Sequence, residues 1–134
     1  MTLTSFQDLL DASQQQEQPQ RLLFVFVTID LPESASEAQR EQTARKTGGN
    51  LSPTLCVDKA PDEVASFSAL VEESSSTGQN WEIVFVSSMS GRAGVAPSTD
   101  EAAQPLRFMV NAINNGRVSE FAAFDRQGNV LQFL

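Results

Sequence analysis

Few side chains in this chain could do chemistry, and the sequence has one cysteine, Cys56, and no histidine. A Ser-His-Asp triad and a Cys-His pair both need an imidazole as general base, so neither can be assembled. Zinc and iron–sulfur sites need several Cys or His ligands. A carboxylate site for magnesium or calcium stays open, although the calcium-loop spacing is absent. We therefore expect no cofactor, no metal and no catalytic residues, and the sequence leans towards a non-enzymatic protein.

The loop at residues 88–97 has the composition of an anion-binding site. Gly91 and Gly94 allow turns that expose backbone N–H groups, and Arg92 adds a fixed positive charge. Ser90 and the N-terminus of the following helix would complete a cradle for an anion. The loop has neither the Gly-Lys-Ser/Thr of a Walker loop nor a GxGxxG pattern. The alternative is a surface connection whose glycines only turn the chain.

Asp58 and Lys59 form a second polar pair, at the end of a short apolar strand. They are candidate ligand-binding residues, and Lys59 would be a nucleophile if it were buried. The alternative is that Asp58 caps the helix opening at Pro61, while Lys59 is solvated. If the strands that precede Asp30, Lys59 and Ser90 are parallel, these polar groups meet at one edge of the sheet. Open α/β sheets bind ligands at that edge.

Cys56 lies between Leu55 and Val57 in the same short strand. Its apolar neighbours predict a cysteine buried in the core, where burial raises the pKa of a thiol and makes it inert. With no histidine in the chain, no obvious base would activate it.

The elements that must position these residues follow from the pattern of apolar side chains. Apolar runs rich in β-branched and aromatic residues predict strands at 21–29, 54–59, 81–87, 121–125 and 130–133. Helical spacing and capping residues predict helices at 4–13, at 34–46 and at about 100–115. A further helix is predicted to begin at Pro61 and to face the core with Val64, Phe67, Leu70 and Val71. Pro105 is expected in the first turn of the last helix.

This order of elements predicts one α/β domain over residues 1–134. Helices between strands favour a parallel or mixed sheet of about five strands, with the helices packed on it. The turn residues 126–129 predict a C-terminal β-hairpin.

Charge and hydropathy restrict the partners. The chain carries nine basic and seventeen acidic residues, a net charge of −8, and the basic residues are scattered. Nucleic acid and anionic membranes are therefore poor partners. The longest apolar run, residues 22–27, is too short to cross a bilayer, and residues 1–5 lack the features of a secretory signal. We expect a protein of the bacterial cytoplasm.

Several segments resemble a family of small proteobacterial proteins of unknown function: residues 21–26, 56–59, 81–86, 90–92 and 124–128. Members are often labelled "ribonucleotide reductase subunit alpha". Ribonucleotide reduction needs a thiyl-radical cysteine, a reducing cysteine pair and a much larger barrel. Cys56 cannot supply three thiols, so the label does not describe catalysis by this chain, and a non-catalytic link to that enzyme stays open.

The function that these observations favour is binding to another protein, or to a second copy as a homodimer. A terminal apolar strand at a sheet edge would be one surface for such pairing. The alternative is a small-molecule or anion-binding domain, with or without catalysis, centred on loop 88–97 and the Asp58–Lys59 turn.

Overall fold

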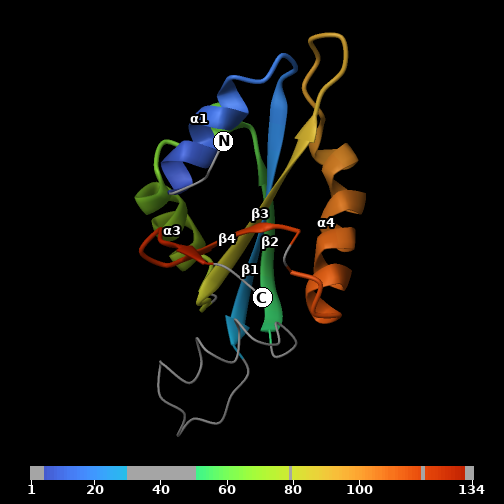
Figure 1. The fold of residues 1–134 in the computed structure, drawn as a ribbon. Coiled ribbons are helices and arrows are strands. Elements are labelled where there is room, and N and C mark those ends of the chain that lie inside the picture. The colour runs from blue at the N-terminus through green and yellow to red at the C-terminus, as the bar shows by residue number, and fades with distance from the viewer. Residues whose placement is uncertain (1–4, 30–50, 79, 119, 132–134) are drawn as a thin grey trace, which may run out of the picture.

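The computed structural model describes residues 5–29, 51–78, 80–118 and 120–131. The strands are β1 (Gln20–Ile29), β2 (Leu51–Lys59), β3 (Ile83–Ser90), β4 (Ala122–Asp125) and β5 (Val130–Leu131). The helices are α1 (Phe6–Gln14), the short 3-10 helix η1 (Pro61–Glu63), α3 (Phe67–Ser75) and α4 (Thr99–Asn114). The strands form one sheet in the order β2-β1-β3-β4-β5. Figure 1 shows α4 on one side of this sheet and α1 and α3 on the other.

Strand β1 is the centre of the fold, because both of its faces are covered. Its continuous apolar sequence suits a strand that is buried on both sides, since alternate side chains point to opposite faces. Leu23, Val25 and Val27 pack with Met109 and Ile113 of α4. On the opposite face, a second cluster joins β1 to α1 and α3 and contains Phe6, Leu10, Leu22, Phe24, Phe26, Leu70 and Trp81.

Serine side chains fix the starts of the three α-helices. Ser5, Ser66 and Ser98 each accept a hydrogen bond from the backbone N–H three residues later. At α4 the Glu101 carboxylate also accepts the N–H of Ser98, which completes a capping box. Each cap satisfies donors that the first turn of a helix leaves without partners.

The predicted α/β class, with five strands in one sheet, helices packed on it and a C-terminal hairpin, is confirmed. The expected parallel or mixed pairing is wrong, because all four pairings are antiparallel. Strands β2 and β3 run in the same direction and are linked through η1 and α3, as a helical crossover requires. However, β1 lies between them, so these two parallel strands are not neighbours.

Two predicted helices differ in detail from those observed. The helix expected to open at Pro61 is split into η1 and α3, because Ser66 caps a new helix at Phe67. Pro105 lies inside α4 rather than in its first turn. Its ring removes only the hydrogen bond to the carbonyl of Glu101, an exposed residue of the first turn. The helix predicted at 34–46 lies outside the described residues.

Candidate functional site

The predicted polar edge is partly assembled, because β2 and β3 end at the same end of the sheet. The start of β1 lies between them, with Leu22 opposite Lys59 and Gln20 opposite Ser90. The end of β1 is at the opposite end of the sheet, where Ile29 pairs with Leu51. Asp30, which follows it, lies outside the described residues.

Asp58 and Lys59 point to opposite faces of the sheet, as neighbours in a strand must. Asp58 lies on the α4 face, where it accepts a hydrogen bond of 2.5 Å from Nε of Arg21. Lys59 lies on the α3 face, where its Nζ is 2.7 Å from Oε1 of Glu73. The two residues therefore do not converge on one ligand, and Asp58 does not cap η1. The N–H of Ala60 is instead bound by the Glu63 carboxylate.

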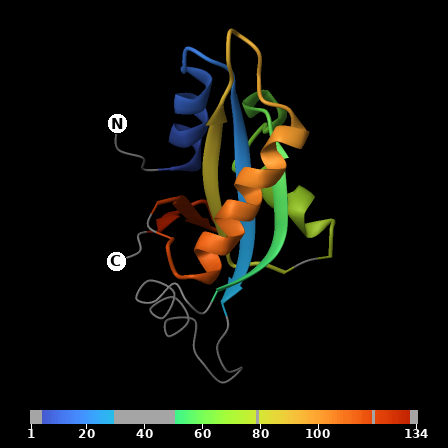
Figure 2. The same ribbon diagram turned by 90° about the vertical axis from the view of Figure 1, so that its right-hand side faces the viewer.

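Arg21, Asp58 and Thr99 form a polar cluster that fixes the start of α4 to the end of β2. Nη2 of Arg21 donates to Oγ1 of Thr99 at 2.8 Å, and that hydroxyl donates to Oδ2 of Asp58 at 3.0 Å. The charged side chains are only 14% and 15% exposed. Because α4 is held there and then crosses the sheet obliquely, it diverges from β2 along its length (Figure 2).

The predicted loop 88–97 begins later than expected, because β3 continues to Ser90 and pairs with β1 up to that residue. Residues 91–97 form a tight backbone structure in which the amides are used within the chain. Arg92 and Val95 exchange hydrogen bonds of 3.0 and 2.9 Å around a two-residue turn at Ala93 and Gly94, which both have positive φ. The N–H of Gly91 donates to the carbonyl of Pro19 at 2.8 Å.

Two further groups at this loop are occupied as well. The N–H of Gly94 donates to Oε1 of Gln18 at 2.8 Å, and the hydroxyl of Ser90 accepts from Nε2 of Gln20 at 3.1 Å. The start of α4 is filled by its own capping box and carries Asp100 and Glu101 in the first turn. Arg92 is exposed at the end of the loop. The backbone N–H donors of the predicted anion cradle therefore bind groups of the chain itself, whereas the Arg92 guanidinium does not take part in these contacts.

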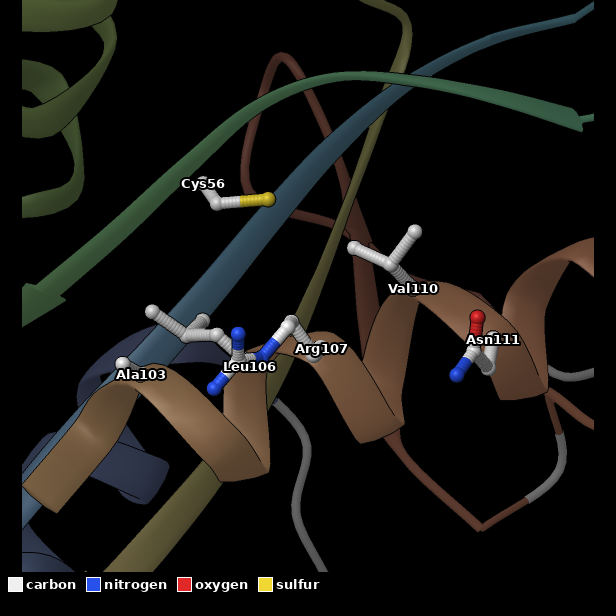
Figure 3. A pocket seen from close by; sticks show the side chains of 6 residues that line it. All are labelled: Cys56, Ala103, Leu106, Arg107, Val110 and Asn111. Carbon is white, nitrogen blue, oxygen red and sulfur yellow. The ribbon is translucent and has the colours of Figure 1, made fainter.

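Cys56 is exposed, so the expectation of a core cysteine is wrong. The reason is its place in the sheet, because β2 is an edge strand and an open groove separates Cys56 from α4 (Figure 3). Partial burial still raises the pKa of the Cys56 thiol above its ordinary value through desolvation. The side chain is therefore a neutral thiol at neutral pH, and it is accessible.

The divergence of α4 from β2 opens a groove of about 360 Å³. In Figure 3, Cys56 projects from β2 into this space, opposite Leu106 and Val110 of α4. The lining is mostly apolar, with two polar side chains on the helix side; its residues are Cys56, Ala103, Leu106, Arg107, Val110 and Asn111. We call this the β2–α4 groove.

The outer edge of β2 borders the same groove. The carbonyl of Val27 accepts from the N–H of Glu82 beside β3, so alternate residues of β1 direct their main-chain groups to β3 and to β2. Phe24 therefore faces β2 and bonds Val57, its partner in register. The N–H and C=O groups of Cys56 and Asp58 then point away from β1. Among the described residues, no strand pairs with this edge.

Arg107 is the cation of this groove. It is exposed, and no described residue forms an ion pair or hydrogen bond with it. Sequence patterns did not single it out, because an arginine on an amphipathic helix is ordinary. Arg107 lines the groove because of the direction in which α4 crosses the sheet. This direction cannot be read from the local sequence of the helix.

The described part of the chain contains neither a metal cluster nor a membrane-spanning helix. No group of three or more Asp, Glu or Cys side chains there could hold a metal ion. None of the helices among those residues has the length and apolar character needed to cross a bilayer.

Comparisons of the chain with protein-family models, with curated proteins and with solved structures give no match. The resemblance noted from the sequence therefore stays a prediction, and the geometry of the β2–α4 groove is the basis for a function.

Proposed function

We propose that this chain is a non-enzymatic protein-binding domain, and that it binds through the outer edge of β2 and the β2–α4 groove. We define these together as the β2–α4 face. The observation that carries the proposal is their juxtaposition: main-chain groups of Cys56 and Asp58 point outward beside an accessible apolar groove. Exposed strand edges recruit further strands, and adjoining pockets select their side chains.

The opposite edge of the sheet offers less to a partner. Within the part of the chain that the structure describes, β5 has two residues, and the preceding Asn129 already forms a bridge with Ser5. The C-terminal hairpin considered from the sequence is therefore the weaker surface, and β2, with nine residues, is the stronger one.

The alternative, an anion- or small-molecule-binding domain around loop 88–97, ranks second. It needs free donors, whereas the amides of Gly91, Arg92, Gly94 and Val95 all donate within the chain. A thermal-shift screen against phosphate and nucleotides tests it, and a shift that disappears in Arg92→Ala would favour this alternative over protein binding.

A photo-reactive group attached to Cys56 tests the proposed face directly. The matched control carries Cys56→Ser and Gln127→Cys, which moves the group to the exposed turn between β4 and β5. We expect an adduct with a protein, or with a second copy, from position 56 only, and we expect excess unlabelled chain to compete it away. Equal adducts from both positions, or none from position 56, would contradict the proposal. Light scattering then separates a homodimer from a complex with another protein.

A further inference from the structure

We propose that the partner at the β2–α4 face is an extended segment that adds to β2 as a sixth strand. It places an aliphatic side chain in the β2–α4 groove and a carboxylate against Arg107. This inference rests on the proposed function and specifies the chemistry of its partner.

The main-chain part of the argument concerns the second half of β2. Cys56 and Asp58 each direct an N–H donor and a C=O acceptor outward, which is the pattern that an added strand pairs with. Pro53 has no N–H, and the register between β1 and β2 shifts next to it. The register skips Thr54, so pairing is confined to residues 55–59, where the strand is regular.

The groove sets the side chain that faces Cys56. Residues directly opposite each other on neighbouring strands point to the same face of a sheet. Cys56 lies on the α4 face, so the partner residue opposite it enters the space beside Leu106 and Val110. The lining there is mostly apolar, and a volume of about 360 Å³ accommodates a branched aliphatic side chain.

The positive charge of Arg107 determines which residue of the partner strand comes next on the α4 face. Arg21 and Lys59, the cations nearest the end of β2, are already paired with Asp58 and Glu73. Arg107 lacks such a partner in the described residues, and a guanidinium prefers a carboxylate, which it can bind through two parallel hydrogen bonds. The net charge of −8 repels a strongly acidic segment, so we infer one carboxylate rather than a run of them.

A second copy of the chain fits this face less well. If two β2 edges paired antiparallel around Cys56, the two α4 helices would lie side by side on one face of the joined sheet. The two copies of Arg107, which flanks Cys56 in the groove, would then face each other. Two unpaired guanidinium groups at such a contact repel, which favours a partner with the opposite charge.

Selection from a displayed library of random twelve-residue peptides on the full-length chain provides the test. We expect enriched peptides to share an aliphatic residue and an Asp or Glu two positions away, within a stretch of β-formers. Bound peptide should slow alkylation of Cys56 by N-ethylmaleimide at least tenfold. No enrichment, or enriched peptides with no acidic residue, would overturn the inference.

A charge exchange identifies the role of Arg107. Arg107→Glu should weaken the selected peptide at least tenfold, and a peptide with Lys in place of its acidic residue should regain the loss. Arg117→Glu, at an exposed arginine just beyond α4, is the matched control and should leave binding within twofold. Loss of binding without this rescue would overturn the assignment.

Backbone pairing is tested at Cys56. Cys56→Pro removes an outward N–H without removing a β1–β2 hydrogen bond, and should weaken the peptide at least tenfold, whereas Cys56→Ser should not. A peptide N-methylated at successive positions gives the same information without altering the chain, and unchanged affinity throughout would refute strand addition. If position 56 cross-links a protein while no peptide binds, the inference fails and the proposed function stands.

Discussion

The backbone N–H of Gly91 donates to the carbonyl of Pro19 at 2.8 Å, and this contact ties the end of β3 to the residue before β1. It also leaves no room at Gly91 for a side chain. A Cβ there would lie 2.1 Å from the carbonyl oxygen of Val95 and 2.9 Å from that of Pro19. The glycine is therefore explained by close backbone approach, which requires no bound anion.

Gly91→Ala should lower the free energy of unfolding by about 3 kcal/mol, because the new methyl group meets two backbone carbonyls that cannot rotate away. Gly94→Ala is the matched control. Gly94 has a φ of +78°, and no atom lies within 4 Å of the position that its new methyl group would take, so the cost should be about 1 kcal/mol from backbone strain alone. Urea unfolding measures both, and equal losses would show that packing at Gly91 does not matter.

Ala93→Asn should stabilise the chain. Ala93 has a φ of 52° and precedes Gly94 in a two-residue turn between Arg92 and Val95. Asn followed by Gly is the pair that such turns prefer, because both central residues need positive φ. We expect a gain of about 0.5–1 kcal/mol in the free energy of unfolding, in keeping with relief of left-handed strain in a non-glycine residue. An unchanged urea midpoint would contradict this.

The two ion pairs at the end of β2 should differ in strength. Arg21 and Asp58 are both largely buried and share Thr99, so a double-mutant cycle should give a coupling of about 1.5–3 kcal/mol. Glu73 is 57% exposed, so the Lys59–Glu73 coupling should be below about 1 kcal/mol and should fall in high salt. Couplings of equal size would contradict the burial argument.

Ser74→Ala should be costly for a single hydroxyl. Nε1 of the buried Trp81 donates to Oγ of Ser74 at 2.7 Å. Removing this acceptor leaves the indole N–H of Trp81 in the core without a hydrogen-bond partner. We expect a loss of about 1–3 kcal/mol in the free energy of unfolding. Ser75→Ala is the control, since that exposed hydroxyl accepts only from Arg126, and it should cost less than about 0.5 kcal/mol.

Cys56 should react with N-ethylmaleimide in the folded chain, and its rate should rise about tenfold per pH unit between pH 6 and 8, because the thiolate is the nucleophile. The raised pKa leaves less thiolate at a given pH than in an unstructured cysteine peptide, so the folded chain should react more slowly there. Its rate should also continue to rise at a pH where the peptide has levelled off. A thiol that reacts only after unfolding would contradict the observed exposure.

How much the sequence can predict depends on the range of the interactions involved. Strand β1 can be recognised from the sequence because a strand buried on both faces has a run of consecutive apolar residues. The Ser5 cap of α1 can be recognised because the cap and the helix it caps are neighbours in the chain. The antiparallel pairing cannot be recognised from the sequence, because it depends on which strand lies between β2 and β3 in the sheet. That choice is made by packing over the whole sheet.

Cys56 shows the same limit at the candidate site. Leu55 and Val57 have the apolar character that predicts burial, and both are half-buried, yet Cys56 between them is exposed. Exposure at an edge strand depends on how far the covering helix extends over it. The anchoring of Thr99 to Asp58 at one end of α4 and the oblique path beyond it determine this, and neither is a local property.

Because Asp58 and Lys59 are consecutive and bind opposite helical layers, the last residues of β2 form a mechanical link through the sheet. Asp58 is bound to Thr99 at the start of α4, and Lys59 is bound to Glu73 of α3. A partner strand docked at this margin would therefore lie beside two residues that are fixed to the helical layers on both faces of the sheet.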